Sequence, residues 1–177
     1  MENLKNEILQ EFENYWAKED KLMEDNAQYF DTEKYTQEFI ENKKAELNRS
    51  KEIYRKMSSE NFERLGNNYI NSLKVDTNKI DSLEYQTKLS NILKIIELKD
   101  GNISRDSIQF MVNARDVNTL QALSTKYNTN TLKEALEEAN IEGLKYKAQE
   151  LIYHANLNLY DFMGKPRKRS DVIQFFK

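Results

Sequence analysis

Hydrophobic residues recur every three or four positions along most of this chain, with polar residues between them. The pattern is densest at 142–163, where one set of apolar residues is spaced as a single helix face: Leu144, Ala148, Leu151, Ile152, Ala155, Leu159, Phe162 and Met163. A second set covers much of the remaining surface of this helix: Tyr146, Tyr153, Leu157 and Tyr160. We therefore expect a central helix with neighbours on several sides, ended by Gly164 and Pro166.

The first 57 residues predict a helical arm. A nearly continuous apolar stripe predicts a first helix over about 3–30. The next stretch, 33–57, keeps helical spacing, but Lys43 and Ser50 interrupt its apolar stripe. So thin a stripe predicts an exposed arm, or one that is completed by another copy of the chain.

Residues 58–163 predict a compact bundle of several helices. Ser58 and Ser59 resemble helix caps and place the boundary with the arm near residue 58. The second strong core helix is expected over about 78–99, with Ile80, Leu83, Tyr85, Leu89, Ile92, Leu93, Ile95, Ile96 and Leu98 as its apolar residues. Further starts and stops are predicted at Asp100-Gly101, Ser104, Asp116 and a Thr131/Glu134 capping box.

Composition supports a helical fold. Four glycines and one proline are very few for 177 residues, and folds with many tight turns need more of both. We therefore expect an all-α fold with a long N-terminal helical arm (1–57), a compact multi-helix bundle (58–163) and a basic C-terminal tail (164–177). No apolar run approaches the ~20 residues of a membrane span, and the polar start lacks a signal-peptide core.

The net charge of −3 conceals an asymmetry between body and tail. Residues 1–163 hold 22 basic and 29 acidic residues, whereas 164–177 hold five basic and one acidic residue. The tail places basic residues before a short apolar peptide, and its candidate partner-binding residues are Lys165, Arg167, Lys168, Arg169, Val172, Ile173, Phe175 and Phe176. Such an end is either a hook that docks on the parent fold or a peptide offered to a partner.

Large apolar residues of the first helix form a second candidate binding site, composed of Phe12, Tyr15 and Trp16. Exposed, these side chains would anchor a partner protein. Buried, they would belong to the core, which is the interpretation that we favour for an amphipathic helix in a small protein.

Residues that could carry chemistry are sparse. The chain has no cysteine, which excludes disulfides and thiolate sites. His154, the only histidine, could be a metal ligand or a general base, but its place on the densest apolar helix favours a packed aromatic. Neither a Gly-rich phosphate loop nor a nucleophile-elbow motif occurs. We therefore expect no catalytic, cofactor or metal site, and a protein that is not an enzyme.

Residues 104–127 predict two helices joined by a short link, an order that resembles a helix-turn-helix. The second helix of this pair carries Lys126 as its one basic residue, so it would neutralise DNA phosphates weakly. An ordinary helical corner is favoured, and nucleic acid is a less favoured partner than protein. The basic tail is the other candidate phosphate contact.

Two short segments carry a family resemblance. They are Asn14-Tyr15-Trp16 and the capped corner 113–123, in a chain rich in Lys and Asn. Together they resemble small helical proteins from the structural gene cassettes of phages of Gram-positive bacteria. Minor head proteins of such phages can carry a similar Asn-Tyr-Trp start, although the larger domain that would follow it does not occur in this sequence. The resemblance implies a virion, scaffolding or assembly role, and it assigns no functional residue.

Our first hypothesis is a non-enzymatic assembly protein, most plausibly a phage or mobile-element structural component. Its partners would be other copies of the chain or a capsid or connector protein, in the bacterial cytoplasm or the virion. A second hypothesis is an inhibitor or regulator of a host nucleic-acid enzyme, because an acidic body could occupy a basic groove. A weak DNA-binding module is the third. None of these needs a cofactor or a membrane.

Overall fold

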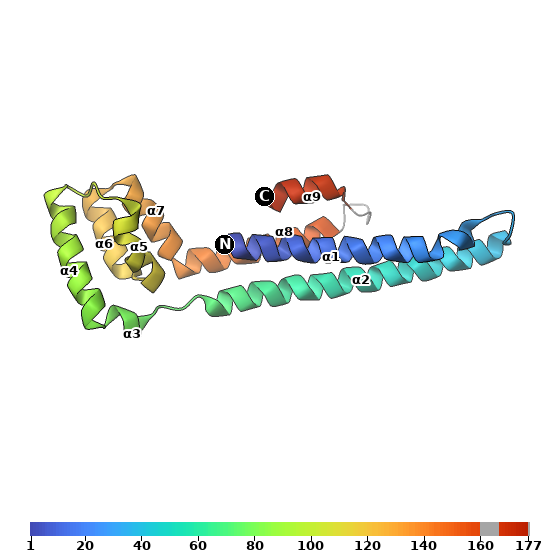
Figure 1. Ribbon diagram of the computed structural model, residues 1–177, viewed down its shortest axis with the longest axis horizontal. Coiled ribbons are helices and arrows are strands. Elements are labelled where there is room, and N and C mark those ends of the chain that lie inside the picture. Colours follow the sequence, from blue (N-terminus) through green and yellow to red (C-terminus); the bar gives the residue numbers. More distant parts are fainter. Residues whose placement is uncertain (160–166, 177) are drawn as a thin grey trace. The chain divides into compact units, whose positions relative to one another are not determined.

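The computed structural model describes residues 1–159 and 167–176, and this part of the chain confirms the predicted all-α class (Figure 1). The elements are α1 (Glu2–Asn26), the 3₁₀ turn η1 (Ala27–Phe30), α2 (Gln37–Ser72), α3 (Thr77–Ile80), α4 (Leu83–Leu98), α5 (Arg105–Ala114), α6 (Val117–Tyr127), α7 (Asn130–Ala139), α8 (Ile141–Leu159) and α9 (Arg169–Phe176). The chain divides into two compact units, 1–69 with 148–177 (unit 1) and 70–147 (unit 2).

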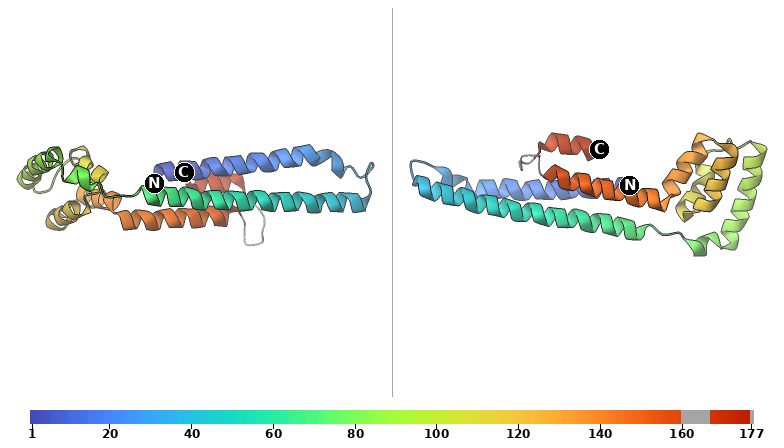
Figure 2. Two further views of the ribbon diagram at one scale, coloured as in Figure 1. Left: turned by 90° about the horizontal axis from the view of Figure 1, so that it is seen from below. Right: turned by 180° about the vertical axis from the view of Figure 1, so that it is seen from behind.

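Unit 1 is built on a hairpin of the two long helices α1 and α2, which run side by side in opposite directions (Figure 2). The predicted stripe of α1 forms its core, with Leu4, Ile8 and Phe12 at most 1% exposed. From α2, Phe62 meets Phe12 with 4.8 Å between ring centroids. The predicted helix over 3–30 is therefore confirmed, with its last turn tightened into η1.

The end of α8 packs closely on α2. A Cβ added at Gly66 of α2 would lie 2.5 Å from Cγ1 of Ile152 in α8, so only glycine permits this approach. The amide of Asn156 donates a hydrogen bond to Glu63, 3.1 Å away. These contacts explain why residues after 147 belong to the same unit as the N-terminal hairpin.

The predicted helix cap and boundary at residue 58 are wrong, because α2 continues without a break through Ser58 and Ser59 to Ser72. Ser58 is 1% exposed, and its hydroxyl donates a 2.8 Å hydrogen bond to Glu11 of α1. A neighbouring helix thus satisfies the hydroxyl that the sequence pattern assigned to a cap. The expected exposed arm at 33–57 is also only partly exposed, since Ile40 and Leu47 are buried.

Unit 2 has its own core, in which α7 packs against both α5 and α6. The buried apolar residues are Ile96, Ile103, Ile108, Met111, Val112, Leu120, Leu123, Leu132, Ala135 and Ala139. The predicted helix over 78–99 is interrupted at Asp81-Ser82, giving α3 and α4, because the Ser82 hydroxyl accepts the Tyr85 N–H at 3.2 Å and starts a new helix. Three of its expected core residues, Leu83, Ile95 and Leu98, are exposed.

Most predicted helix ends of unit 2 are confirmed. Asp100 and Gly101 have φ of 48° and 79°, and Arg115 and Asn128 also adopt the left-handed conformation. Asp116 caps α6 by accepting the Thr119 N–H. The predicted Thr131/Glu134 capping box is wrong, because the N-cap of α7 is Thr129, two residues before Thr131.

The helix α8 is amphipathic rather than apolar all round. One face is buried through Leu144, Ala148, Ile152, Ala155 and Leu159. The second predicted face is solvent-exposed, with Tyr146 and Tyr153 at 62% and 60% and Leu157 at 40%. The second predicted apolar face is therefore not covered, although α8 does contact two helices, α2 through Ile152 and α9 through His154. Tyr160, Phe162 and Met163, and the predicted stop at Gly164 and Pro166, lie outside the described residues.

Within the described ranges, no helix combines the length and the apolar character that crossing a membrane requires.

Candidate functional site

The two sets of predicted partner-binding residues contact each other. The ring of Phe176 in α9 lies 5.7 Å from that of Phe12 in α1, and both side chains are at most 1% exposed. Val172, one turn earlier on α9, is equally buried. The tail therefore docks on its own fold. Of the two alternatives that its sequence left open, docking and a peptide offered to a partner, this structure shows the first.

This docking corrects several expected anchors. Phe12, Tyr15 and Trp16 are 0%, 1% and 8% exposed, so they form core and cannot serve as surface anchors in this conformation. In the tail, Val172 and Phe176 are buried for the same reason, and Ile173 is partly buried. Phe175, at 47% exposure, and the exposed Arg167 and Lys168 remain on the surface, while Lys165 lies outside the described residues.

Charge complementarity holds the start of α9 on α1. Residues 1–30 carry eight acidic and three basic residues, and the tail is the most basic segment of the chain. Arg169 donates two parallel hydrogen bonds to the Asp20 carboxylate, at 2.8 and 2.5 Å. The Arg169 guanidinium lowers the pKa of Asp20, and the hydrogen bond with Asp20 raises the pKa of Arg169.

His154 has an aromatic environment. Its ring lies 5.0 Å from Phe175 and 5.6 Å from Tyr153. Across the part of the chain that the structure describes, no group of three or more His, Cys, Asp or Glu side chains could hold a metal ion. The histidine thus joins α8 to the docked α9.

A buried polar cluster between α1 and α2 escaped the sequence analysis. Arg55 is 7% exposed, and its Nε donates to the Tyr15 hydroxyl at 3.2 Å while Nη1 donates to Glu52 at 2.7 Å. Glu19 is also buried, and its Oε1 has no hydrogen-bond partner among the described residues. The signal that could have revealed this cluster is Glu19 itself, a charged residue inside an apolar stripe.

Arg55 keeps its positive charge within this cluster. Burial raises the pKa of the Tyr15 hydroxyl, and the neighbouring Glu19 carboxylate raises it further. Burial alone would lower the pKa of Arg55, but the hydrogen bond with Tyr15 and the nearby carboxylates outweigh it, so the pKa is raised. A permanently charged guanidinium between two helices fixes how α1 and α2 align, because any shift would leave the charge without partners.

A groove lies near the turn of the hairpin, beyond the contacts of α9. It has a volume of 320 Å³ and is lined by Met23, Phe30, Lys44, Leu47, Asn48 and Lys51. The α9 contacts with α1 involve Phe12, Trp16 and Asp20, which all precede Met23 along the helix. Met23 is accordingly 42% exposed, and the groove combines an apolar floor with two lysines at its edge.

The groove has a sequence origin. Lys43 and Ser50 interrupt the apolar stripe of α2 on either side of Leu47, so the two helices have too few apolar residues to cover each other there. The thin stripe did indicate an incompletely covered surface. It could not indicate the position of the lysines, which depends on how α1 and α2 align.

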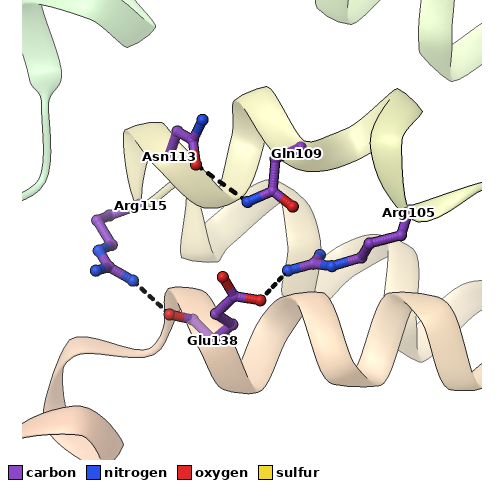
Figure 3. A network of polar contacts seen from close by, with 5 residues as sticks. All are labelled: Arg105, Gln109, Asn113, Arg115 and Glu138. Carbon is purple, nitrogen blue, oxygen red and sulfur yellow. Dashed lines mark hydrogen bonds and ion pairs between the residues drawn. The ribbon is translucent and has the colours of Figure 1, made fainter. Parts of the chain in front are cut away.

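A polar network in unit 2 joins both ends of α5 to α7 (Figure 3). Arg105 donates to the Glu138 carboxylate, and Arg115 donates to the Glu138 main-chain carbonyl. Beside them the Gln109 amide donates to Asn113 at 3.1 Å. The two arginines thus hold the end of α7 against α5, which is a structural role for this corner.

The one basic residue of the second helix in the candidate helix-turn-helix is also engaged within unit 2. Lys126 of α6 lies over the Tyr127 ring at 4.8 Å and forms a 3.8 Å ion pair with Glu97.

A comparison with protein-family models, curated proteins and solved structures found no match to this chain. The function is therefore argued from the surfaces of the protein itself.

Proposed function

We propose that the protein is a non-enzymatic assembly protein that binds other protein subunits through the groove near the hairpin turn. The observation that carries the proposal is this groove, where an apolar floor of Met23, Phe30 and Leu47 reaches the surface between two lysines. Protein interfaces gain most of their affinity from a few apolar anchors that enter such depressions, with polar residues around them.

The hairpin is suited to this task because it is held in one alignment. The charged cluster around Arg55 fixes the register of α1 on α2, and α9 packs on the middle of α1, at Phe12, Trp16 and Asp20. A surface presented by pre-aligned helices loses little conformational entropy when a partner binds. The groove therefore offers a rigid binding surface rather than one that must first be ordered.

The resemblance to phage structural cassettes gives the proposal its setting. It supports a minor virion, scaffold or connector-associated component of a phage or mobile element, acting in the bacterial cytoplasm or the virion. In this chain Tyr15 and Trp16 of the Asn-Tyr-Trp segment are buried in the hairpin. The segment would thus serve such a protein by stabilising its arm, while the groove contacts the partner.

Site-directed cross-linking tests the proposal, because the natural chain has no cysteine that would compete for the label. Asn48→Cys places a photoreactive maleimide in the groove, and Asn118→Cys places the same label on the exposed surface of α6. In an extract of cells that make the protein, we expect discrete protein adducts from position 48 only. Equal labelling from both positions, or none from position 48, would contradict a groove that binds protein.

A second candidate function is inhibition of a basic nucleic-acid enzyme, favoured by the acidic surface of α1. Glu2, Glu7, Glu13, Glu24 and Asp25 are all exposed on this helix. If the surface imitates nucleic acid, binding to the enzyme must weaken steeply with salt and after replacement of these carboxylates by amides. Binding that resists both changes would exclude this function and favour the apolar groove.

A further inference from the structure

One leucine of unit 2 is strongly exposed and is followed and preceded in the sequence by nearby acidic residues. Leu83, the first residue of α4, is 83% exposed. Asp81 and Glu84 on either side of it are exposed as well. The next basic residue of α4, Lys88, lies over the Phe110 ring at 4.8 Å, and it also lines a shallow surface depression together with Leu83 and Glu84.

The groove of unit 1 has the complementary character. Its apolar floor can receive an aliphatic side chain, and Lys44 and Lys51 supply positive charge at its edge. Two acidic residues around one leucine therefore match two lysines around one apolar groove. Neither surface is used by the contacts within its own unit that are described above.

We propose that Leu83 of one copy enters the groove of a second copy, where Asp81 and Glu84 pair with Lys44 and Lys51. The inference rests on the proposed assembly function and names its partner as the chain itself. Because the leucine and the groove are different surfaces, the contact is heterologous, and each copy can add a further copy. Assembly therefore grows with protein concentration.

Leu98 shows why exposure alone does not identify the anchor. It is 86% exposed at the other end of α4, but its neighbours are Glu97, which pairs with Lys126 at 3.8 Å, and Lys99. Its surroundings thus lack the two flanking acidic residues that would pair with the two lysines of the groove. Leu98 is a control matched in residue type, exposure and helix.

A charge-swap experiment with the purified chain tests the contact by sedimentation velocity over a concentration series. The wild type is expected to form species larger than 21.1 kDa as concentration rises, and less so in high salt. Lys44→Glu/Lys51→Glu gives a copy with an acidic groove, and Asp81→Lys/Glu84→Lys gives a copy with a basic anchor. Each variant alone should lose assembly, because its groove and its anchor then carry the same charge.

Mixing the two variants should restore assembly. The acidic anchor of the first fits the natural basic groove of the second, and the basic anchor of the second fits the acidic groove of the first. Leu83→Ser should weaken self-association by about tenfold or more, whereas Leu98→Ser should leave it unchanged. Circular dichroism confirms that each variant keeps its helices before it is compared.

Three results would overturn the inference: a wild type that remains a 21.1 kDa monomer at the highest concentration, a mixture that does not reassemble, or equal effects of the two leucine substitutions. The proposed function would survive any of them if the label at position 48 still captures a different protein. It would fail separately if that label captures nothing.

Discussion

Arg169 lies over the indole ring of Trp16, with 5.5 Å between the guanidinium carbon and the ring centroid. The same guanidinium holds the Asp20 carboxylate one helical turn further along α1. One tail residue thus combines a cation–π contact with a bidentate ion pair. Because Trp16 is the only tryptophan, its fluorescence reports directly on the docking of α9.

Replacing Phe176 by alanine should release α9 from the hairpin. The ring is 1% exposed and packs on Phe12, and loss of such a buried ring costs about 3 kcal/mol. Because α9 is a short terminal helix, we expect this loss to appear as undocking, with a red shift of Trp16 emission and faster proteolysis of the tail. The matched control is Phe175→Ala.

Phe175 has the same residue type and is 47% exposed, so its removal should change the emission little. An equal red shift in both variants would show that α9 is not anchored by its buried ring. A Phe176→Ala protein with unchanged emission and proteolysis would contradict the docking itself.

The docking of α9 should weaken in acid. The hydrogen bonds from Arg169 lower the pKa of Asp20 below its ordinary value of 3.8. A carboxylate whose pKa is lower in the docked state stabilises that state above pH 3.8, and this stabilisation is lost as the pH falls through the lowered pKa. Trp16 emission should therefore change in that acidic range, while the apolar contacts of α9, which do not depend on pH, are still in place.

Asp20→Asn is the control for this titration, because an amide cannot ionise. Its emission near neutral pH should already lie closer to the acidic state of the wild type. If the variant reproduces the full acidic transition of the wild type, another carboxylate is responsible.

The sequence predicted helices better than it predicted what they contact. The spacing of Leu4, Ile8 and Phe12 identified a buried helix face because such periodicity depends on local geometry alone. Ser58 and Ser82 show the limit, since both are serines between helical stretches and yet one is inside α2 and the other caps α4. The difference is Glu11, a partner from another helix that no local pattern could supply.

The prediction of candidate binding residues was limited in the same way, because the sequence pattern does not show which helices contact each other. The tail and arm residues that were expected to anchor a partner protein include Phe12 and Phe176, which pack on each other instead. Leu83 was assigned to the core because the apolar residues of α4 were counted without regard to the face on which each one lies. Leu83 lies about half a turn around the helix axis from both Tyr85 and Ile96, so it faces away from the buried side of α4.

Tyr85→Phe should destabilise unit 2. The Tyr85 hydroxyl donates a 2.7 Å hydrogen bond to Asp116, and these residues are 4% and 7% exposed. Removal of the hydroxyl leaves the Asp116 carboxylate with one partner fewer in a buried place, at a cost of about 1–3 kcal/mol. Urea denaturation measures this loss, and Tyr153→Phe, at a site 60% exposed, is the control with the same chemical change. Equal midpoints for the two variants would show that the buried hydrogen bond contributes nothing.

Gly66→Ala should destabilise unit 1 although alanine favours helices. The new Cβ would lie 2.5 Å from Cγ1 of Ile152, so α8 must move away from α2. Overpacking of this kind costs about 1–3 kcal/mol, which exceeds the gain of about 0.5–1 kcal/mol from replacing a helical glycine. Gly143→Ala is the control, because its Cβ would meet only Asn140 at 3.4 Å and should leave stability unchanged or higher.

A double-mutant cycle tests whether the Ile152 side chain is what restricts residue 66 to glycine. Ile152→Ala removes Cγ1 and leaves a cavity, so by itself it should destabilise the protein by about 2–5 kcal/mol. In the Gly66→Ala/Ile152→Ala protein the new methyl group enters that cavity, and the two losses should sum to less than their separate values. If urea denaturation gives strictly additive losses in the free energy of unfolding, α2 and α8 do not meet at residues 66 and 152. The assignment of residues after 147 to the N-terminal unit would then lack its closest supporting contact.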